Sequence, residues 1–155
     1  MAKAYLVLRI KGQADVPHWA RTTMSLLKLE KKHRATVVPA TPSTSGMLKR
    51  IQTFVAWSDA DADIVRELLE KKARKAGYRR ITDEDIRAMG YEGAEALAES
   101  LSEGKVALSK LGPLKPWFAL APPRLGFKRS TKRLAGQKGI LGRNADLPEL
   151  VRRMI

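Results

Sequence analysis

The sequence predicts an α+β fold, with a small β-α-β-α-β unit in residues 1–57 and a helical extension with a basic loop and a C-terminal helix in residues 58–155. Three observations support this prediction. Apolar residues alternate in residues 4–11, two further short stretches of the first 57 residues are rich in strand-forming residues, and helical spacing lies between these stretches. Helical spacing continues through the middle of the chain. It then disappears in a stretch rich in glycine, proline, lysine and arginine.

Three strands are expected in the first unit. Residues 4–11 (AYLVLRIK) alternate between apolar and more polar positions and contain β-branched and aromatic side chains, which is typical of a strand. Residues 35–38 predict a short second strand that Pro39 stops, because proline cannot donate to a sheet ladder. Residues 53–57 (TFVAW) predict the third.

Two helices separate these strands. The first is expected to start around Pro17, which a first helical turn tolerates, with Asp15 as its cap and an end near Leu29. The second begins at Thr41 and Pro42, since a capping threonine followed by proline at the first helical position is a common helix start.

The middle of the chain predicts three more helices. The first covers residues 59–76 and is closed by Gly77, and the second opens at the capping residue Thr82 and ends near Gly90. Residues 94–101 carry the apolar stripe of the third.

The C-terminal third predicts an extended segment and one helix. Residues 104–145 hold six glycines and four prolines and lose hydrophobic periodicity after Leu120, so a long loop without regular structure is expected. Asp146 and Glu149, three residues apart before an apolar stripe, predict a capping-box start for a terminal helix.

Charge is the strongest indication of a partner. The chain carries 30 lysines and arginines against 16 acids, a net charge of +14. The net charge is +8 in residues 1–57, −4 in residues 58–104 and +10 in residues 105–155. Two basic segments around an acidic middle suggest two contact surfaces on one polyanion, most simply a nucleic acid. An anionic membrane surface is a weaker candidate, because it calls for a basic amphipathic helix with bulky apolar residues.

The expected RNA-binding residues are lysines and arginines of these two segments. They are Arg9, Lys11, Arg21, Lys28, Lys31, Lys32, Arg34, Lys49, Arg50, Lys115, Arg124, Lys128, Arg129, Lys132, Arg133, Lys138 and Arg143. Trp117 and Phe118 could stack on bases or fill the core, and core packing is favoured.

Other chemistries find little support. The chain has no cysteine and two histidines, and its acids cluster away from both, so no catalytic residue is expected. Acids at positions 59, 61, 63 and 70 fit part of a calcium-loop template, but Ile64 stands where that loop needs glycine, so a helix is preferred. The glycines at 136, 139 and 142 lack the lysine and Ser/Thr of a phosphate loop. We therefore expect no metal, no cofactor and no small-molecule substrate.

A series of short motifs along the whole chain resembles one family. They are Arg9-Ile10, the helix at 21–29, Thr41-Pro42 with Gly46-Met47-Leu48, Val55-Ala56-Trp57, Lys75-Ala76-Gly77-Tyr78, Ile81-Thr82-Asp83, Lys115-Pro116-Trp117-Phe118, Lys128-Arg129, Gly142-Arg143-Asn144 and the terminal Leu150-Val151-Arg152-Arg153-Met154. In this order they resemble the long archaeal form of the universal large-subunit ribosomal protein family numbered thirty in bacteria and seven in eukaryotes. The bacterial pattern usually has Leu-Gly-Leu where this chain has Leu27-Lys28-Leu29.

The resemblance implies a fold, a role and partners. It implies a split ferredoxin-like antiparallel sheet of order 3-1-2 with two helices on one face, and a structural, non-enzymatic constituent of the large ribosomal subunit. Large-subunit rRNA and neighbouring ribosomal proteins would be its partners, and it would be soluble and cytoplasmic, without membrane contact. A non-ribosomal nucleic-acid binder, for example of chromatin DNA, and a nucleic-acid-processing enzyme remain alternatives.

Overall fold

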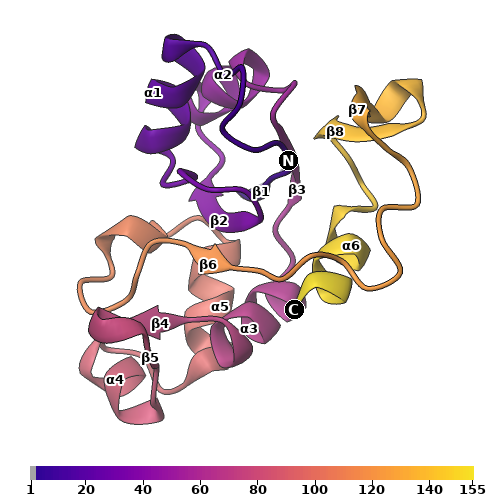
Figure 1. The fold of residues 1–155 in the computed structure, drawn as a ribbon. Helices are drawn as coiled ribbons and strands as arrows, with labels where there is room; N and C mark the ends of the chain where they lie inside the picture. The colour runs from indigo at the N-terminus through magenta and orange to yellow at the C-terminus, as the bar shows by residue number, and fades with distance from the viewer. Residues whose placement is uncertain (1–2) are drawn as a thin grey trace.

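The computed structural model describes residues 3–155 and has mixed α and β structure throughout (Figure 1). The helices are α1 (His18–Leu26), α2 (Pro42–Arg50), α3 (Ala62–Lys71), α4 (Asp83–Ala88), α5 (Ala94–Ser102) and α6 (Leu147–Met154). The strands are β1 (Ala4–Arg9), β2 (Arg34–Pro39), β3 (Val55–Asp59), β4 (Arg74–Lys75), β5 (Arg79–Arg80), β6 (Phe118–Ala119), β7 (Ser130–Leu134) and β8 (Gly139–Arg143). Short 3₁₀ turns lie at η1 (Ala76–Tyr78), η2 (Leu108–Lys110) and η3 (Ala135–Gln137). The predicted α+β class is confirmed.

The main sheet has the strand order β6-β2-β1-β3-β8-β7. Strand β1 lies between β2 and β3 and is antiparallel to both. Strand β6 adds an antiparallel edge to β2, whereas β8 pairs with β3 and with β7 in parallel. The first three strands thus lie in the order 3-1-2 and are antiparallel, and three strands from the second half of the chain, which were not expected in the sheet, extend it on both sides.

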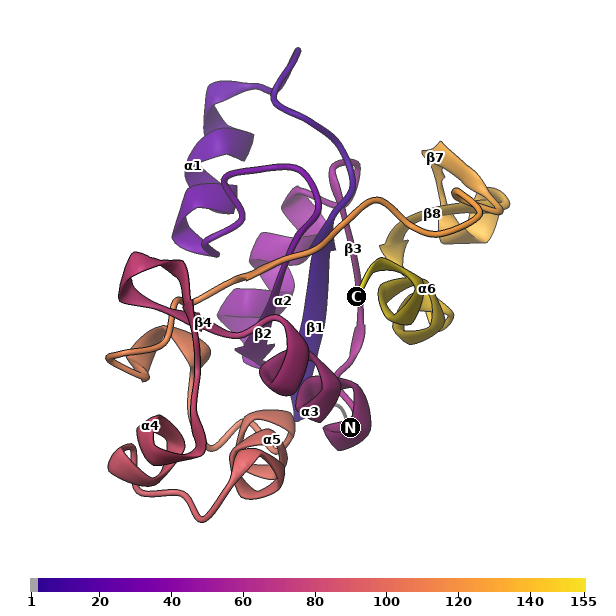
Figure 2. The ribbon, with the colours of Figure 1, turned by 60° about the horizontal axis from the view of Figure 1, so that its bottom comes forward.

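Both faces of the central strands are buried, so that helices and sheet form three layers. Leu6 and Leu8 of β1 belong to a first hydrophobic cluster with α3, α5 and α6, whereas Val7 faces a second cluster with α1 and α2. Figure 2 shows α2 and α3 on opposite sides of β1. Position 57 lies within β3, and residues from both predicted parts of the chain meet in the first cluster. The division into 1–57 and 58–155 stays a prediction.

Two helix starts follow the predicted chemistry. The hydroxyl of Thr41 accepts a hydrogen bond from the Thr44 amide at 3.1 Å, with Pro42 as the first residue of α2. Thr82 and Asp85 form a reciprocal capping box at α4, which satisfies amides that a helix start leaves unpaired.

Other helix boundaries differ from the predictions. Asp15 lies in a loop with a φ of 54° and does not cap α1, whose cap position is Pro17 and whose last residue is Leu26 rather than Leu29. Helix α3 ends at Lys71, and Gly77 instead forms the tip of the β4–β5 hairpin with a φ of 77°. The predicted capping box of Asp146 and Glu149 does not form, since no side-chain hydrogen bond caps α6. The Asp146 amide instead donates a hydrogen bond to Oδ1 of Asn144.

The expected long loop is also wrong in its second half. Residues 130–134 and 139–143 form β7 and β8, which with η3 make an arm at the right of Figure 1. The segment before the arm is fastened to α6, since the Ala121 amide donates to the Met154 carbonyl and Arg153 donates to the carbonyls of Arg124 and Gly126. Ile140 and Leu141 are buried and supply the apolar material that periodicity did not reveal.

Candidate nucleic-acid interface

The turn between α1 and β2 carries a dense group of cations. Lys28, Lys31 and Lys32 are exposed there, and Arg34 is half-buried where β2 begins. Lys28 has a φ of 62°, a left-handed conformation that glycine adopts more easily than lysine. The turn therefore carries a charged side chain at a position whose backbone glycine would adopt more easily.

Arg9 does not join this surface. Its side chain is 3 % exposed, and its guanidinium donates to the carbonyls of Leu29, Lys11 and Gly12 at 2.7, 2.9 and 3.0 Å. Burial, followed by the nearby charges of Arg21 and Arg34, lowers the pKa of Arg9 from its ordinary value. Three of the five N–H donors of this guanidinium already face carbonyls, so we leave Arg9 out of the contact residues proposed below.

The two basic segments meet in a groove beside the arm. Lys11 and Lys32 from the first segment and Lys132 of β7 all line its space of about 620 Å³. Phe127 lies in the same groove, and its ring stacks on that of His33 with centroids 6.3 Å apart. Burial, with a smaller contribution from Lys32, lowers the pKa of His33, so the neutral ring is favoured beside these lysines.

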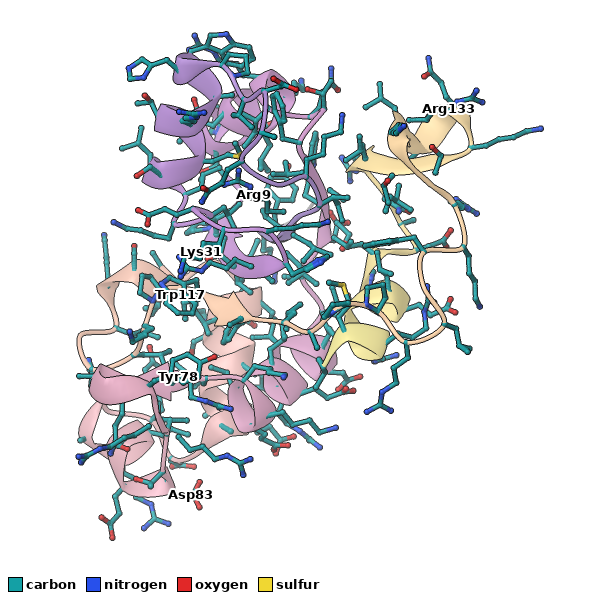
Figure 3. All side chains as sticks on the ribbon, viewed as in Figure 1. Arg9, Lys31, Tyr78, Asp83, Trp117 and Arg133 are labelled. Carbon is teal, nitrogen blue, oxygen red and sulfur yellow. The ribbon has the colours of Figure 1, made fainter. Side chains whose placement is uncertain are left out.

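The arm presents further cations to solvent. Lys132, Arg133 and Lys138 are exposed, and Figure 3 shows Arg133 far from the turn that carries Lys31. The remaining predicted cations near the arm are Arg124, which is exposed, and three residues in ion pairs: Lys128 with Glu149 at 3.9 Å, Arg129 with Asp146 at 3.1 Å, and Arg143 with Asp59 at 3.3 Å. Exposed ion pairs of this kind contribute little free energy, so a phosphate can replace the carboxylate at small cost.

A second basic area lies on α1 and α2. Lys49 and Arg50 occupy the last turn of α2, where cations favourably meet the helix dipole. The Arg50 guanidinium lies 5.1 Å from the ring centroid of Trp19, which is 42 % exposed, and Arg21 is exposed on the same helix as Trp19.

The two aromatic residues at 117 and 118 have different environments. Phe118 is fully buried in the first hydrophobic cluster, as core packing predicts. Trp117 is only half-buried, with the Arg34 guanidinium 3.8 Å and the Lys115 ammonium 5.3 Å from its ring centroid. The prediction of core packing is therefore right for Phe118 and wrong for Trp117.

Sequence reasoning missed the cations of the β4–β5 hairpin. Arg79 and Arg80 are exposed, and Arg74 and Lys75 are half-buried on the paired strand. They were overlooked because the surrounding stretch, residues 58–104, has a net charge of −4. Four cations around one tyrosine in the seven residues RKAGYRR is the local signal that could have found them.

Signs of other functions are few in residues 3–155. Asp61 is the cap residue of α3 and Asp63 lies in its first turn, so these acids belong to a helix start rather than a calcium loop. Over the described range no three His, Asp or Glu side chains lie together as a metal site would need. Over the same range no helix has the length and apolar composition needed to cross a membrane.

Comparisons with known proteins point to one group of relatives. A family model described as ribosomal protein L30p/L7e matches residues 5–55. Over the full length of both chains, the protein is 63 % identical to large ribosomal subunit protein uL30 of Nitrosopumilus maritimus and 56 % identical to that of Cenarchaeum symbiosum. It is 39 % identical to the protein of the same name from Staphylothermus marinus, again over the whole of both chains.

Proposed function

Because the chain belongs to the ribosomal protein L30p/L7e family, we propose that it binds large-subunit rRNA through two basic surfaces and stabilises the assembled subunit. Like the other members of its family, it is a structural protein of the large ribosomal subunit in the cytoplasm and is not an enzyme. The rRNA contacts are the part of this function that the proposal adds.

One observation carries the proposal: cations more than 90 residues apart in the chain face the same groove. Lys11 and Lys32 of the first unit and Lys132 of the arm line it together. Gathering like charges in one place costs electrostatic free energy in the isolated protein. A phosphate backbone in the groove would remove that cost and release its condensed counterions.

The proposed contact residues are the predicted cations apart from Arg9. They are Lys11, Arg21, Lys28, Lys31, Lys32, Arg34, Lys49, Arg50, Lys115, Arg124, Lys128, Arg129, Lys132, Arg133, Lys138 and Arg143. Lys11, Arg34 and Lys115 are half-buried and the others are exposed, so each can present at least part of its charged group to phosphate.

Neighbouring ribosomal proteins are the second proposed class of partner. Helix α4 begins with Asp83 and Glu84, which are exposed and repel phosphate. Figure 3 shows Asp83 at the end of the molecule opposite Arg133. Protein contacts therefore suit the acidic first turn of α4 itself better than RNA contacts do.

Binding of purified protein to large-subunit rRNA over a range of salt concentrations tests the proposal. Neutralising on the order of five or more phosphates gives a log–log slope of roughly −3 or steeper, at about 0.7 per contact. A nearly flat salt response would contradict the electrostatic account. Competition with duplex DNA at fixed salt, and co-sedimentation with large subunits in high salt, separate an rRNA protein from a general nucleic-acid binder.

The enzyme alternative predicts a different result in the same preparations. RNA incubated with protein and divalent cations should remain intact. Cleavage that a single carboxylate substitution abolishes would favour a nucleic-acid-processing enzyme instead.

A further inference from the structure

An exposed tyrosine stands at the tip of the β4–β5 hairpin. Arg74 pairs with Arg80 and Lys75 with Arg79, and the connection between the strands contains Gly77 and Tyr78. Both connecting residues are left-handed, with φ of 77° and 58°. Tyr78 at this tip is 53 % exposed.

Local stability does not explain a tyrosine in this position. A left-handed residue with a bulky side chain is strained, and glycine or asparagine would adopt the same backbone more easily. Burial of the ring offers little compensation, since half of the residue faces water. A strained, exposed aromatic residue at a rigid tip is a reason to look for a ligand.

The hairpin is held firmly against the chain segment that carries Trp117. The Lys115 amide donates to the Arg74 carbonyl at 2.8 Å, and the backbones of Lys75 and Leu114 form an isolated antiparallel β-bridge. On the other side, the Lys75 ammonium donates to the Asp85 carboxylate at 2.8 Å, and this bond, together with two hydrogen bonds from Thr82, lowers the pKa of Asp85 to about 2. Contacts on both sides fix where the tip lies.

These contacts bring two aromatic rings and several cations together. The rings of Tyr78 and Trp117 lie 6.4 Å apart with a 32° angle between their planes. The Arg34 guanidinium covers Trp117 at 3.8 Å, and that of Arg74 lies 5.5 Å from the Tyr78 centroid. Figure 3 shows Tyr78 and Trp117 neighbouring each other on the side of the molecule that also carries Lys31.

We propose that Tyr78, supported by Trp117, is a stacking platform for an unpaired RNA base, and that Arg79 and Arg80 hold the phosphates beside that base. This inference rests on the proposed rRNA binding and names one subsite within it. Aromatic faces accept any base, and arginines next to them retain the backbone, which is how single-stranded RNA is commonly bound. Arg79 and Arg80 are exposed, and within residues 3–155 neither forms an ion pair, so both are available to phosphate.

The test compares variants of the full chain for binding to rRNA purified from archaeal large subunits. Tyr78→Asn removes the ring and keeps a residue that tolerates the left-handed backbone, so the variant should melt no lower than the parent. Its affinity should fall about 5- to 150-fold, the range for losing one stacked base, with an unchanged salt slope. Tyr78→Phe should bind as the parent does, because the ring is retained.

One further variant serves as a control, and another tests the proposed phosphate contacts. Leu125→Asn makes the matched change at another exposed, left-handed residue, with 93 % exposure and a φ of 63°, and should leave affinity within about twofold. Replacing both Arg79 and Arg80 by alanine should reduce the salt slope by roughly 1.4, two contacts at about 0.7 each.

The outcomes separate this subsite from the general function. If the parent binds rRNA with a steep salt slope and Tyr78→Asn binds equally well, the stacking platform is wrong and the rRNA binding stands. If the parent itself does not bind, both proposals are overturned. If Tyr78→Phe is as weak as Tyr78→Asn, the hydroxyl and not the ring face is responsible, which also overturns stacking.

Discussion

At the scale of single residues, Arg9 shows how a cation can belong to the fold. Its sequence context, on an alternating strand beside Lys11, is that of a surface charge. In the folded chain it joins β1 to the turn after α1 through the Leu29 carbonyl, and to the loop at Lys11 and Gly12. Three segments thus share one guanidinium, whose planar fork can serve several carbonyls at once.

Replacing Arg9 by methionine should destabilise the protein. The methionine fills similar space but leaves three carbonyls without their donor, so the free energy of unfolding should fall by roughly 2–4 kcal/mol. Denaturant titration measures this, with Arg21→Met as an exposed control that should change it by less than about 0.5 kcal/mol. A variant as stable as the parent that binds rRNA more weakly would return Arg9 to the interface.

Lys28 shows the opposite case, a strained backbone kept with a charged side chain. A φ of 62° strains the backbone of a lysine but not that of a glycine, so Lys28→Gly should raise the free energy of unfolding by about 1 kcal/mol. The same change should weaken rRNA binding and reduce the salt slope by about 0.7, since one phosphate contact is lost.

Lys31→Gly is the control for this prediction. Lys31 is exposed on the same turn and does not have a positive φ, so its replacement should reduce the salt slope without raising stability. If Lys28→Gly lowers the melting temperature as much as Lys31→Gly does, strain at position 28 is not the explanation.

At the scale of elements, the arm is the part that sequence patterns described least well. Its strands contain few apolar residues, of which Ile140 and Leu141 are buried and Leu134 packs partly against the core, so no period-two pattern stands out. What orders β8 is its parallel pairing with β3, whose residues lie more than 80 positions earlier. Pairing between such distant residues cannot be recognised in a short window of sequence. The start of helix α2 can, because Thr41 and Pro42 define it locally.

Gly139 tests how closely the arm's two strands must approach. A methyl group at this position would overlap the carbonyl of Arg133, whereas Gly136 has open space around it. Gly139→Ala should therefore separate β7 from β8, speed tryptic cleavage after Lys132 and Arg133, and weaken rRNA binding by displacing these cations.

Gly136→Ala is the matched control, and it should leave proteolysis and binding unchanged because its backbone needs no positive φ. Equal cleavage rates for the two alanine variants would show that the arm does not depend on this contact.

At the scale of the whole molecule, the sheet is covered on both faces by different parts of the chain. Helices α1 and α2, from the first unit, cover one face, and α3, α5 and α6, from the extension, cover the other. The inner face of β1, with Leu6 and Leu8, is fully buried only because the extension lies on it. A continuous apolar face of this kind would promote association if it were left open.

A fragment of residues 1–61 should therefore not behave as the full chain does. It contains β1 to β3 but lacks every helix that covers the first cluster, so we expect self-association and no cooperative melting. Size-exclusion chromatography and thermal melting measure both properties, with the full chain as the control. A monomeric fragment with a sharp transition would show that the division at residue 57 is also a folding boundary.

Local chemistry in the sequence was enough for the alternation of β1, the caps at Thr41 and Thr82, the mixed α and β class and the overall basic character, because each depends on neighbouring residues or on composition. The family followed instead from the resemblance of short motifs, in their order along the chain, to known proteins. Contacts between distant segments were needed for the rest. They bury Arg9, they extend the sheet with β6, β7 and β8, they bring Lys132 to the same groove as Lys11 and Lys32, and they bring Tyr78 beside Trp117. Such contacts depend on where the chain returns in space, and that is settled only when all of its elements pack around one sheet.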